Sequence, residues 1–341
     1  MARTPTVEDV ARAAGVSRQT VSNVLNNPGI VRRSTQEKVL NAVKELGYRP
    51  HTAARQLRTR RSSAIGVHLD PYRGGISGVM LDRFVHALTE RATARAMRVL
   101  VYTARDVDEE IRRIEDLVDG GEIDAVVLSG TRHQDPRTTW LHAHGIPFAS
   151  FGRPWGATRD AAGMDAHPWV DVDSAVGTEL ATRHALENGA RRITFLGWPA
   201  GSGTGDDRER GWLRALEEAG GVAPGERLAV DDDVTAARLA VAAVLAGDGT
   251  DAVVCASDVL AIGAHLAGLD AGRPELLIYG FDNTPTADAL GISSVEQQPE
   301  RVASAVLDQL MGPDGTSVRP QAELSEGRHV LVVPELVVRS P

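Results

Sequence analysis

The chain has 341 residues, a formal net charge of −9 and a single cysteine. This length is too great for one hydrophobic core, so we expect two or more domains. A lone cysteine excludes an internal disulfide. The chain shows neither a long uncharged apolar stretch nor an N-terminal apolar signal segment, so we expect a cytoplasmic protein without membrane contact.

The charge is unevenly distributed along the chain. Residues 1–61 hold 12 Lys and Arg against 4 Asp and Glu, a net charge of +8, which leaves −17 for residues 62–341. A basic N-terminal region on an acidic body is typical of a protein whose first domain binds nucleic-acid phosphates.

Residues 6–26 predict two short helices joined by a tight turn. Thr6 can cap the first helix, with Asp9 as its reciprocal partner. Gly15 allows a left-handed turn, and Ser17 can cap the second helix. This is a helix-turn-helix pattern, in which the second helix enters the DNA major groove.

The second helix has an apolar face and a polar face. Its polar face consists of Arg18, Gln19, Thr20 and Asn23, opposite Val21, Val24 and Leu25. Arg18 and Gln19 come first on the exposed side, where base edges are met, and these side chains suit guanine and adenine respectively. Helix-turn-helix patterns also occur in proteins that do not bind DNA, but the charge distribution argues against that alternative.

A third helix is expected to support the first two, which are too short to be stable alone. Residues 34–37, Ser-Thr-Gln-Glu, predict a capping box, and Gly47 a C-terminal cap. The expected apolar stripe is Val39, Leu40, Val43 and Leu46.

The sequence of the head, TVEDVARAAGVSRQTVSNVLNNPGIVRRSTQEKVLNAVKELGYRPHTAARQLRT, resembles that of transcription regulators of the lac-repressor and purine-repressor (LacI/GalR) family. The likeness continues through SSAIGV, IPFASFGRP, RRITFLG, RERGWLRAL, CASDVLAIGA, YGFDN and VPELVVRSP, and so covers nearly the whole chain.

The resemblance implies a hinge helix at residues 52–58 that orders only on operator DNA. Two helical turns are too few to be stable alone. In the family, a leucine from each subunit wedges into the minor groove, and Leu57 matches it; such a wedge kinks the duplex. A flexible linker with Leu57 packed on the body is the alternative, but four arginines flank Leu57 and favour the wedge. The expected DNA contacts are Thr6, Ser17, Arg18, Gln19, Thr20, Ser22, Asn23, Asn26, Tyr48, His51, Ala54, Arg55, Leu57 and Arg58.

From residue 64 onward, short apolar runs alternate with amphipathic helices. The runs are 64–69, 98–102, 125–128, 147–151, 192–197, 252–255 and 276–280. Apolar strands separated by helices indicate parallel sheets covered on both faces. We therefore expect an all-α helix-turn-helix head plus hinge helix, and an α/β body of two doubly wound lobes. The resembled fold is that of periplasmic sugar-binding proteins.

The expected domains are a head at 1–50, a hinge at 51–62 and a body at 63–341. The resemblance places chain crossings between the lobes near residues 166, 292 and 325. The N-lobe then takes about 63–166 and 292–325, and the C-lobe about 167–291 and 326–341.

Ligands of doubly wound folds bind at the carboxyl ends of the strands. Residues just after the strands are therefore the candidate effector contacts: Asp70, Tyr72, Arg153, Arg208, Asp258, Phe281 and Asp282. In the resembled family, an arginine matching Arg208 clamps ligand hydroxyls or carboxylates. Sugars need paired donors and acceptors and an aromatic face, which Phe281 or Tyr72 could supply.

Several of these assignments have alternatives. The segment Asp70–Ser77 departs from the family's Asn-Pro-Phe-Phe-like stretch, and any of the polar residues could be a loop cap or a surface charge. For Trp155, Trp169 and Trp198 a packing role is at least as plausible as a ligand contact.

Signals for an enzyme are weak. Residues 201–205 read Gly-Ser-Gly-Thr-Gly, but Asp206 stands where a dinucleotide fingerprint needs its third glycine, and nearby acidic residues would repel a pyrophosphate. The ten histidines lack metal-ligand spacing. Cys255 lies in an apolar run and is expected to be a buried, inert thiol. We therefore expect a non-enzymatic protein without a cofactor or metal.

The resulting prediction is a ligand-responsive transcription regulator, specifically a repressor, that senses a sugar or sugar derivative in the cleft. It binds palindromic operator DNA as a homodimer, because one head reads only a half-site. The family's tetramers use an extra C-terminal helix, for which the sequence up to Pro341 leaves no room. A sugar-transport component would need an export signal and no DNA-binding head. The sequence leaves open which effector binds and whether it releases or strengthens operator binding.

Overall fold

The computed structural model describes residues 5–26, 28–48, 61–69, 78–132, 135–155, 167–220, 225–247, 249–315, 317–324 and 329–339. By its internal contacts the chain divides into two compact units, Met1–Ser62 and Ser63–Pro341. Each unit is described by itself.

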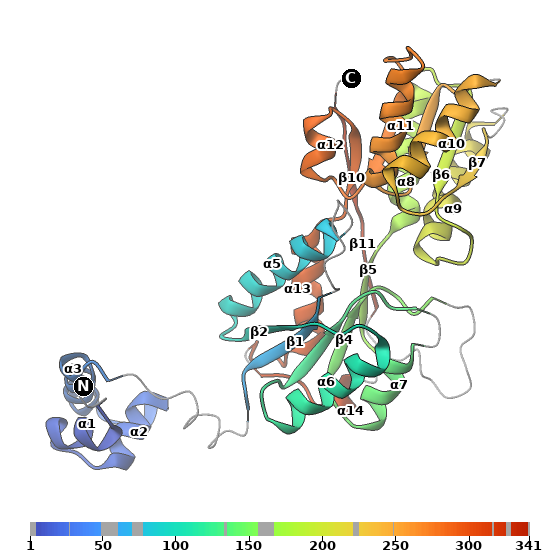
Figure 1. The fold of residues 1–341 in the computed structure, drawn as a ribbon. Coiled ribbons are helices and arrows are strands. Elements are labelled where there is room, and N and C mark those ends of the chain that lie inside the picture. Colours follow the sequence, from blue (N-terminus) through green and yellow to red (C-terminus); the bar gives the residue numbers. More distant parts are fainter. Residues whose placement is uncertain are drawn as a thin grey trace. The chain divides into compact units, whose positions relative to one another are not determined.

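The first unit is helical (Figure 1). It contains α1 (Val7–Ala14), α2 (Arg18–Asn26), a short 3₁₀ turn η1 (Pro28–Ile30) and α3 (Arg33–Leu46). The predicted caps of the first two helices are confirmed. Thr6 and Asp9 form a capping box, Gly15 has φ 64°, and the Oγ of Ser17 accepts a hydrogen bond from the amide of Thr20 at 3.1 Å. These caps set the turn between α1 and α2.

The prediction for the start of α3 is wrong. The helix begins at Arg33, its N-cap Arg32 makes no side-chain capping bond, and Ser34 lies inside the first turn. The side chain of Gln36 instead donates hydrogen bonds to the carbonyls of Pro28 at 2.8 Å and Val31 at 2.7 Å. Gln36 thus fastens η1 to α3, and Glu37, the expected partner of Ser34, lies 3.6 Å from Nε of Arg33 instead.

A small apolar core holds these helices together. The buried residues are Val10, Ala11, Val21, Val24, Val39 and Ala42. Of the expected stripe on α3, Val39 is buried and Val43 packs at the edge of the core, but Leu40 and Leu46 are 51% and 37% exposed. Ala42 is buried in the core of the head instead.

The N-lobe of the second unit is a parallel six-stranded sheet in the order β11-β5-β4-β3-β1-β2. Its strands are β1 (Ala64–His68), β2 (Arg98–Tyr102), β3 (Ala125–Leu128), β4 (Phe148–Phe151), β5 (Trp169–Val172) and β11 (His329–Val332). Its helices are α5 (Val79–Ala94), α6 (Val107–Asp119), α7 (Pro136–Ala143), α13 (Pro299–Leu310) and α14 (Gln321–Leu324).

Both faces of this sheet are covered. Alternate residues of β3 enter different cores: Val127 packs in the cluster that contains Phe84 of α5 and Val302 of α13, whereas Val126 packs with Ile114 of α6 and Leu141 of α7. This alternation explains why the strand reads as a continuous apolar run.

The C-lobe is a second six-stranded sheet in the order β12-β10-β9-β8-β6-β7, in which only β12 runs antiparallel to its neighbour. Its strands are β6 (Ile193–Gly197), β7 (Arg227–Ala229), β8 (Ala252–Cys255), β9 (Leu277–Phe281), β10 (Ser293–Glu296) and β12 (Glu335–Val337). Its helices are α8 (Ser174–Glu187), α9 (Thr204–Ala219), α10 (Val234–Ala246), α11 (Asp258–Asp270) and α12 (Pro285–Ala289).

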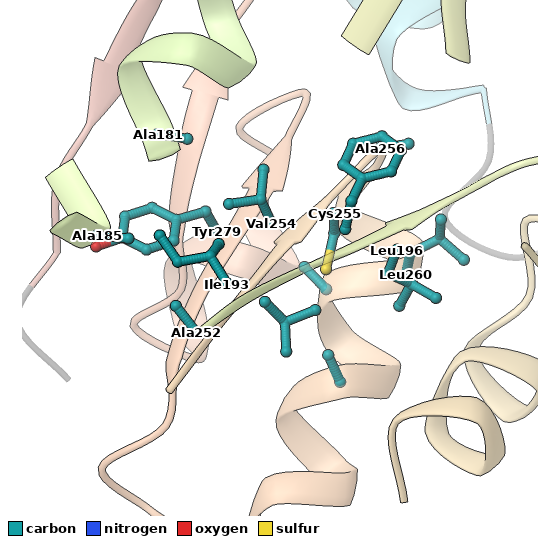
Figure 2. Packing of buried hydrophobic residues seen from close by; sticks show 14 of the residues in the cluster. Ala181, Ala185, Ile193, Leu196, Ala252, Val254, Cys255, Ala256, Leu260 and Tyr279 are labelled. Atoms are coloured by element: carbon teal, nitrogen blue, oxygen red, sulfur yellow. The ribbon is translucent and has the colours of Figure 1, made fainter. Parts of the chain in front are cut away.

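The core of the C-lobe contains the only cysteine of the chain. Figure 2 shows Cys255 among labelled neighbours that include Leu196, Val254 and Leu260. The thiol is fully buried, and its burial raises the pKa of Cys255 well above the usual value. The expectation of a buried cysteine is therefore confirmed. Within the described ranges, no helix combines the length and the apolar character needed to cross a bilayer.

The chain crosses between the two sheets three times. Strand β5 belongs to the N-lobe sheet and leads into α8 of the C-lobe, β10 belongs to the C-lobe sheet and leads into α13, and β11 leads from the N-lobe into β12. The sequence analysis had assigned β5, β10 and β11 to the lobe that the chain enters at each crossing. In the structure each of these strands belongs to the sheet of the lobe that the chain leaves. The expected positions near 166, 292 and 325 are corrected to the segments after β5, β10 and β11, because backbone pairing assigns a strand to its sheet and hydropathy alone does not.

Candidate functional sites

The second helix of the head presents a polar surface. Arg18 and Gln19 are exposed in the first turn of α2. The side-chain amide of Gln19 donates to Asn23 Oδ1 at 3.1 Å, and Arg18 Nη1 lies 2.9 Å from Glu8 Oε1. Exposed ion pairs of this kind contribute little, so Arg18 can exchange Glu8 for another partner at small cost.

The other candidate DNA contacts differ in their surroundings. Thr6 and Ser17 are held in caps, and Thr20, Ser22 and Asn23 are half-buried along α2. Tyr48 packs against the core of the head. The side chain of Asn26 and the predicted hinge contacts lie outside the described residues; these hinge contacts are His51, Ala54, Arg55, Leu57 and Arg58.

A cavity of about 310 Å³ lies between the lobes of the second unit, at the carboxyl ends of the strands. That position agrees with the general rule for doubly wound sheets. From the N-lobe it is lined by Gly78, Met80, Leu81, Ser129, Gly130, Thr131, Phe151, Gly152, Trp155 and Asp171. The remaining lining residues are Ser174, Thr204, Arg208 and Gln297.

Arg208, in the first half of α9, lines this cavity and is 4% exposed. Its guanidinium carbon lies 3.6 Å from the centre of the Phe281 ring, and Nη1 donates to the carbonyl of Ala256. Burial lowers the pKa of Arg208, opposed first by the carboxylate of Asp282. Within the described part of the chain, Nε of Arg208 is buried and has no hydrogen-bond partner.

Phe281 does not form a wall of the cavity. The ring is fully buried beneath Arg208 and faces α8, where a Cβ at Gly177 would lie 2.8 Å from it. The aromatic side chains that line the cavity are Phe151 and Trp155, at and beyond the end of β4. Sequence reasoning gave Trp155 no preference for ligand contact and did not consider Phe151, although both lie near a strand end, as Arg153 does.

Asp282 lies at the end of β9 with φ 109°, an unusual backbone conformation for a residue with a side chain. Its Oδ1 accepts a hydrogen bond from the side-chain amide of Gln297, at the crossing between β10 and α13. Burial raises the pKa of Asp282 to about 7; Arg208 opposes this shift and Asp258 adds to it. A ligand that bonds to Asp282 therefore acts next to a crossing between the lobes.

Asp258 is occupied within the C-lobe. Its two carboxylate oxygens accept hydrogen bonds from the amide of Thr284 at 2.6 Å and from the hydroxyl of Ser294 at 2.6 Å. The residue is fully buried, and burial raises its pKa. These bonds fix the loop after β9, which carries Asp282, so the geometry supports a positioning role for Asp258.

Arg153 connects the two lobes. Its Nε lies 2.6 Å from Asp171 Oδ2, and its Nη2 lies 3.2 Å from Oδ2 of Asp207 on α9. The guanidinium also lies 4.5 Å from the centre of the Trp155 ring. The other two effector candidates of the N-lobe, Asp70 and Tyr72, fall outside the described ranges.

Arg83 forms a second bridge between the lobes that the sequence analysis missed. From α5 its Nη2 contacts Glu296 Oε2 at 2.7 Å, and its Nη1 donates to the carbonyl of Asp282 at 3.0 Å. An arginine near the start of an amphipathic helix gives no sequence signal for such a contact.

The glycine-rich loop before α9 is closed by its own acidic residue. The carboxylate of Asp206 accepts hydrogen bonds from the amides of Gly201 at 3.0 Å and Gly203 at 3.3 Å. These are amides that a bound phosphate would need. Among the residues that the structure describes, no cluster of metal-ligating side chains is found.

A helix-turn-helix head joined to a two-lobed body with an interlobe cavity defines the class of ligand-controlled transcription regulators. Comparison with known families supports this class. Residues 6–51 match the bacterial regulatory proteins of the lacI family, and residues 80–309 match the periplasmic binding proteins and sugar binding domain of the LacI family. The chain belongs to the LacI family of transcription regulators.

Individual relatives are similar over nearly the full chain. The HTH-type transcriptional regulator CelR of Thermobifida fusca is 30% identical, over 93% of this chain and 95% of its own. A solved structure titled transcriptional regulator CelR-cellobiose complex is 27% identical with a TM-score of 0.67, covering 98% of this chain and 99% of that one. The lac repressor dimer bound to operator is 23% identical with a TM-score of 0.75, covering 99% and 98%, which supports the shared fold.

Proposed function

We propose that this regulator is a dimeric repressor that binds a two-fold symmetric operator and responds to a saccharide-class ligand in the interlobe cavity. The carrying observation is that one chain joins a recognition helix with exposed Arg18 and Gln19 to a cavity lined by both lobes of its body. A relative solved in complex with cellobiose, and a structural neighbour solved as a dimer on operator DNA, support the proposal.

In this proposal the head divides its work between base edges and backbone. Arg18 and Gln19 read bases from the first turn of the recognition helix. Phosphate and sugar contacts come from Thr6, Ser17, Thr20, Ser22, Asn23, Asn26 and Tyr48. The hinge residues His51, Ala54, Arg55 and Arg58 follow the minor groove, with Leu57 as the wedge at the dyad.

The cavity offers the groups that a sugar needs. Arg208 lines the cavity with a guanidinium, a hydrogen-bond donor, and Asp171 lines it with a carboxylate, a hydrogen-bond acceptor. The hydroxyls of Ser129, Thr131, Ser174 and Thr204 can both donate and accept, as sugar hydroxyls do. Phe151 and Trp155 provide aromatic surface for the C–H face of a sugar ring.

Ligand binding can reach the DNA through the angle between the lobes. Arg83 and Arg153 bridge the lobes beside the cavity, so a ligand that alters their partners alters the closed state. The hinge segment immediately precedes the N-lobe in the sequence, and two helical turns are too few to be stable without added contacts. A small change in the lobes can therefore bias an order–disorder transition on DNA, and the coupling must be reciprocal.

The test uses the full chain. Selection from random DNA identifies the operator, and a thermal-shift screen covers sugars, sugar phosphates and purines, since a ligand of the native state raises the melting temperature. Operator titrations then compare affinity with and without any ligand found. The proposal is contradicted if the selection finds no preferred DNA sequence. It is also contradicted if a ligand binds but leaves the affinity for the operator unchanged. If purines bind and sugars do not, the assignment of the ligand to the saccharide class is wrong.

Arg208→Ala provides the matching variant. We expect it to lose the ligand response while keeping the operator affinity of the ligand-free protein, because Arg208 lies in the cavity, within the second unit of the chain. If Arg208 serves only the packing of the C-lobe, the Arg208→Ala variant should have a lower melting temperature than the wild type and should still respond to the ligand.

A further inference from the structure

Trp155 of the N-lobe lies directly against the backbone of the C-lobe. A Cβ built on Gly203 would overlap the indole ring, with Cδ2 of Trp155 at 2.6 Å and Cδ1 at 2.9 Å. Gly203 is the N-cap of α9, and Trp155 comes four residues after the end of β4. The ring can take this position only because residue 203 has no side chain.

The same turn of α9 receives a second contact from the same loop. Arg153, two residues before Trp155, reaches Asp207 in that turn, and its guanidinium stacks on the Trp155 ring at 4.5 Å. Arg208, the next residue of α9, lines the cavity. The loop after β4 thus holds the helix that carries the central ligand donor.

Trp155 is also a wall of the cavity. The cavity volume of about 310 Å³ is small, since ligand pockets commonly span roughly 300–1,000 Å³. A ligand that extends past this wall must displace the ring from Gly203 and lose the packing between the two lobes.

We propose that Trp155, by packing on Gly203, closes one side of the cleft and sets the longest saccharide that this regulator accepts. This inference rests on the saccharide function proposed above. Trp155 is then a specificity-determining residue: it contributes aromatic surface to a short ligand and excludes a longer one by occupying its path.

The chain offers a matched control for the contact. Gly203 and Gly201 both have positive φ, 68° and 90°, so alanine is strained at either position. A Cβ at Gly201, however, would have no heavy atom within 4 Å. Gly203→Ala therefore adds backbone strain and a collision with Trp155, whereas Gly201→Ala adds strain alone.

The contact can be observed without a ligand. The full chain labelled with 5-fluorotryptophan contains five fluorinated residues, and Trp155→Phe assigns the resonance of Trp155. We expect Gly203→Ala to shift this resonance and Gly201→Ala to leave it in place; Trp140 and Trp169, stacked on His144 and His329, serve as internal references. Equal responses to the two alanine variants overturn the contact and the inference with it.

The length limit is tested by calorimetric titration with glucose, cellobiose and cellotriose. We expect Trp155→Ala to weaken binding of the shortest saccharide that the wild type binds. The ratio of the affinity for the next longer saccharide to the affinity for this shortest one should rise by about tenfold or more. Gly203→Ala, which pushes the ring away, should change the preference in the same direction, and Gly201→Ala should not.

The outcomes separate this inference from the proposed function. Saccharide binding with the same length preference in wild type and Trp155→Ala overturns the inference and leaves the function standing. If the fluorine resonance behaves as expected but neither these three saccharides nor any sugar of the thermal-shift screen binds the wild type or the variants, the saccharide function fails and the length limit fails with it.

Discussion

Asp282→Asn should be more stable than the wild type, and the difference in the free energy of unfolding between the two proteins should grow as the pH rises. Burial raises the pKa of this carboxyl to about 7, whereas an unfolded aspartate titrates near 3.8. The folded state therefore keeps its proton between these values, and the stability of the wild type falls as the pH rises from about 4 to 7 and is then constant. Asp282→Asn keeps the shape and removes the titration.

The size of this effect follows from the shift. A shift of this size corresponds to about 4 kcal/mol at ~1.36 kcal/mol per pH unit. Because Asp282 is half-buried and not fully enclosed, we expect roughly half of this energy, ~2 kcal/mol, or about 4–8 °C in melting temperature. The larger stability of the variant should be fully developed above about pH 7.

Differential scanning fluorimetry of both proteins between pH 4.5 and 8.5, at about 0.15 M salt, measures the difference. Asp231→Asn, at an exposed position of the same lobe, is the control and should track the wild type at every pH. A difference between Asp282→Asn and wild type that stays constant over this range, or that shrinks as the pH rises, would refute the reasoning.

Three further predictions concern DNA reading and packing. Arg18→Ala should remove the base preference at one symmetric position of each half-site, at a cost of ~1–3 kcal/mol; a binding-site selection that returns the wild-type preference contradicts this. Leu57→Ala should weaken specific binding and reduce DNA bending while sparing non-specific affinity, and equal bending in a permutation assay would rule out the wedge. Gly211→Ala would place a Cβ on the carbonyl of Ala175, where α9 packs against α8, so we expect the free energy of unfolding to fall by ~1–3 kcal/mol or more. The melting temperature should be lower than that of the wild type; an unchanged value would show that the two helices can move apart freely.

The caps and turns of the head could be predicted because they depend on neighbours in the sequence. Thr6 with Asp9, Gly15 and Ser17 act within four residues of their partners. The capping box at residues 34–37 failed because α3 begins earlier, at Arg33, which places Ser34 inside the first turn, while Gln36 ties that turn to the carbonyls of Pro28 and Val31. Those carbonyls are brought near α3 by the fold of η1, which the local pattern does not contain.

The cavity shows the same division. Its place at the strand ends, and the presence there of Arg208, follow from hydropathy, chain order and the family resemblance. The sequence does not indicate that Phe281 lies beneath Arg208 while Phe151 and Trp155 line the wall. All three aromatics lie at or just beyond strand ends, and only the packing of α8 and α9 decides which ones face the cavity.

The sequence by itself determined the class of the protein: a basic helix-turn-helix head, a two-lobed α/β body and an arginine at the cleft, because local propensity, hydropathic period and charge are properties of short segments. The tertiary structure alone decided which sheet each of β5, β10 and β11 joins, and that Arg83, Arg153 and Trp155 connect the lobes. These depend on residues up to about two hundred positions apart, whose contacts arise only when the backbone ladders and packed helices bring them together.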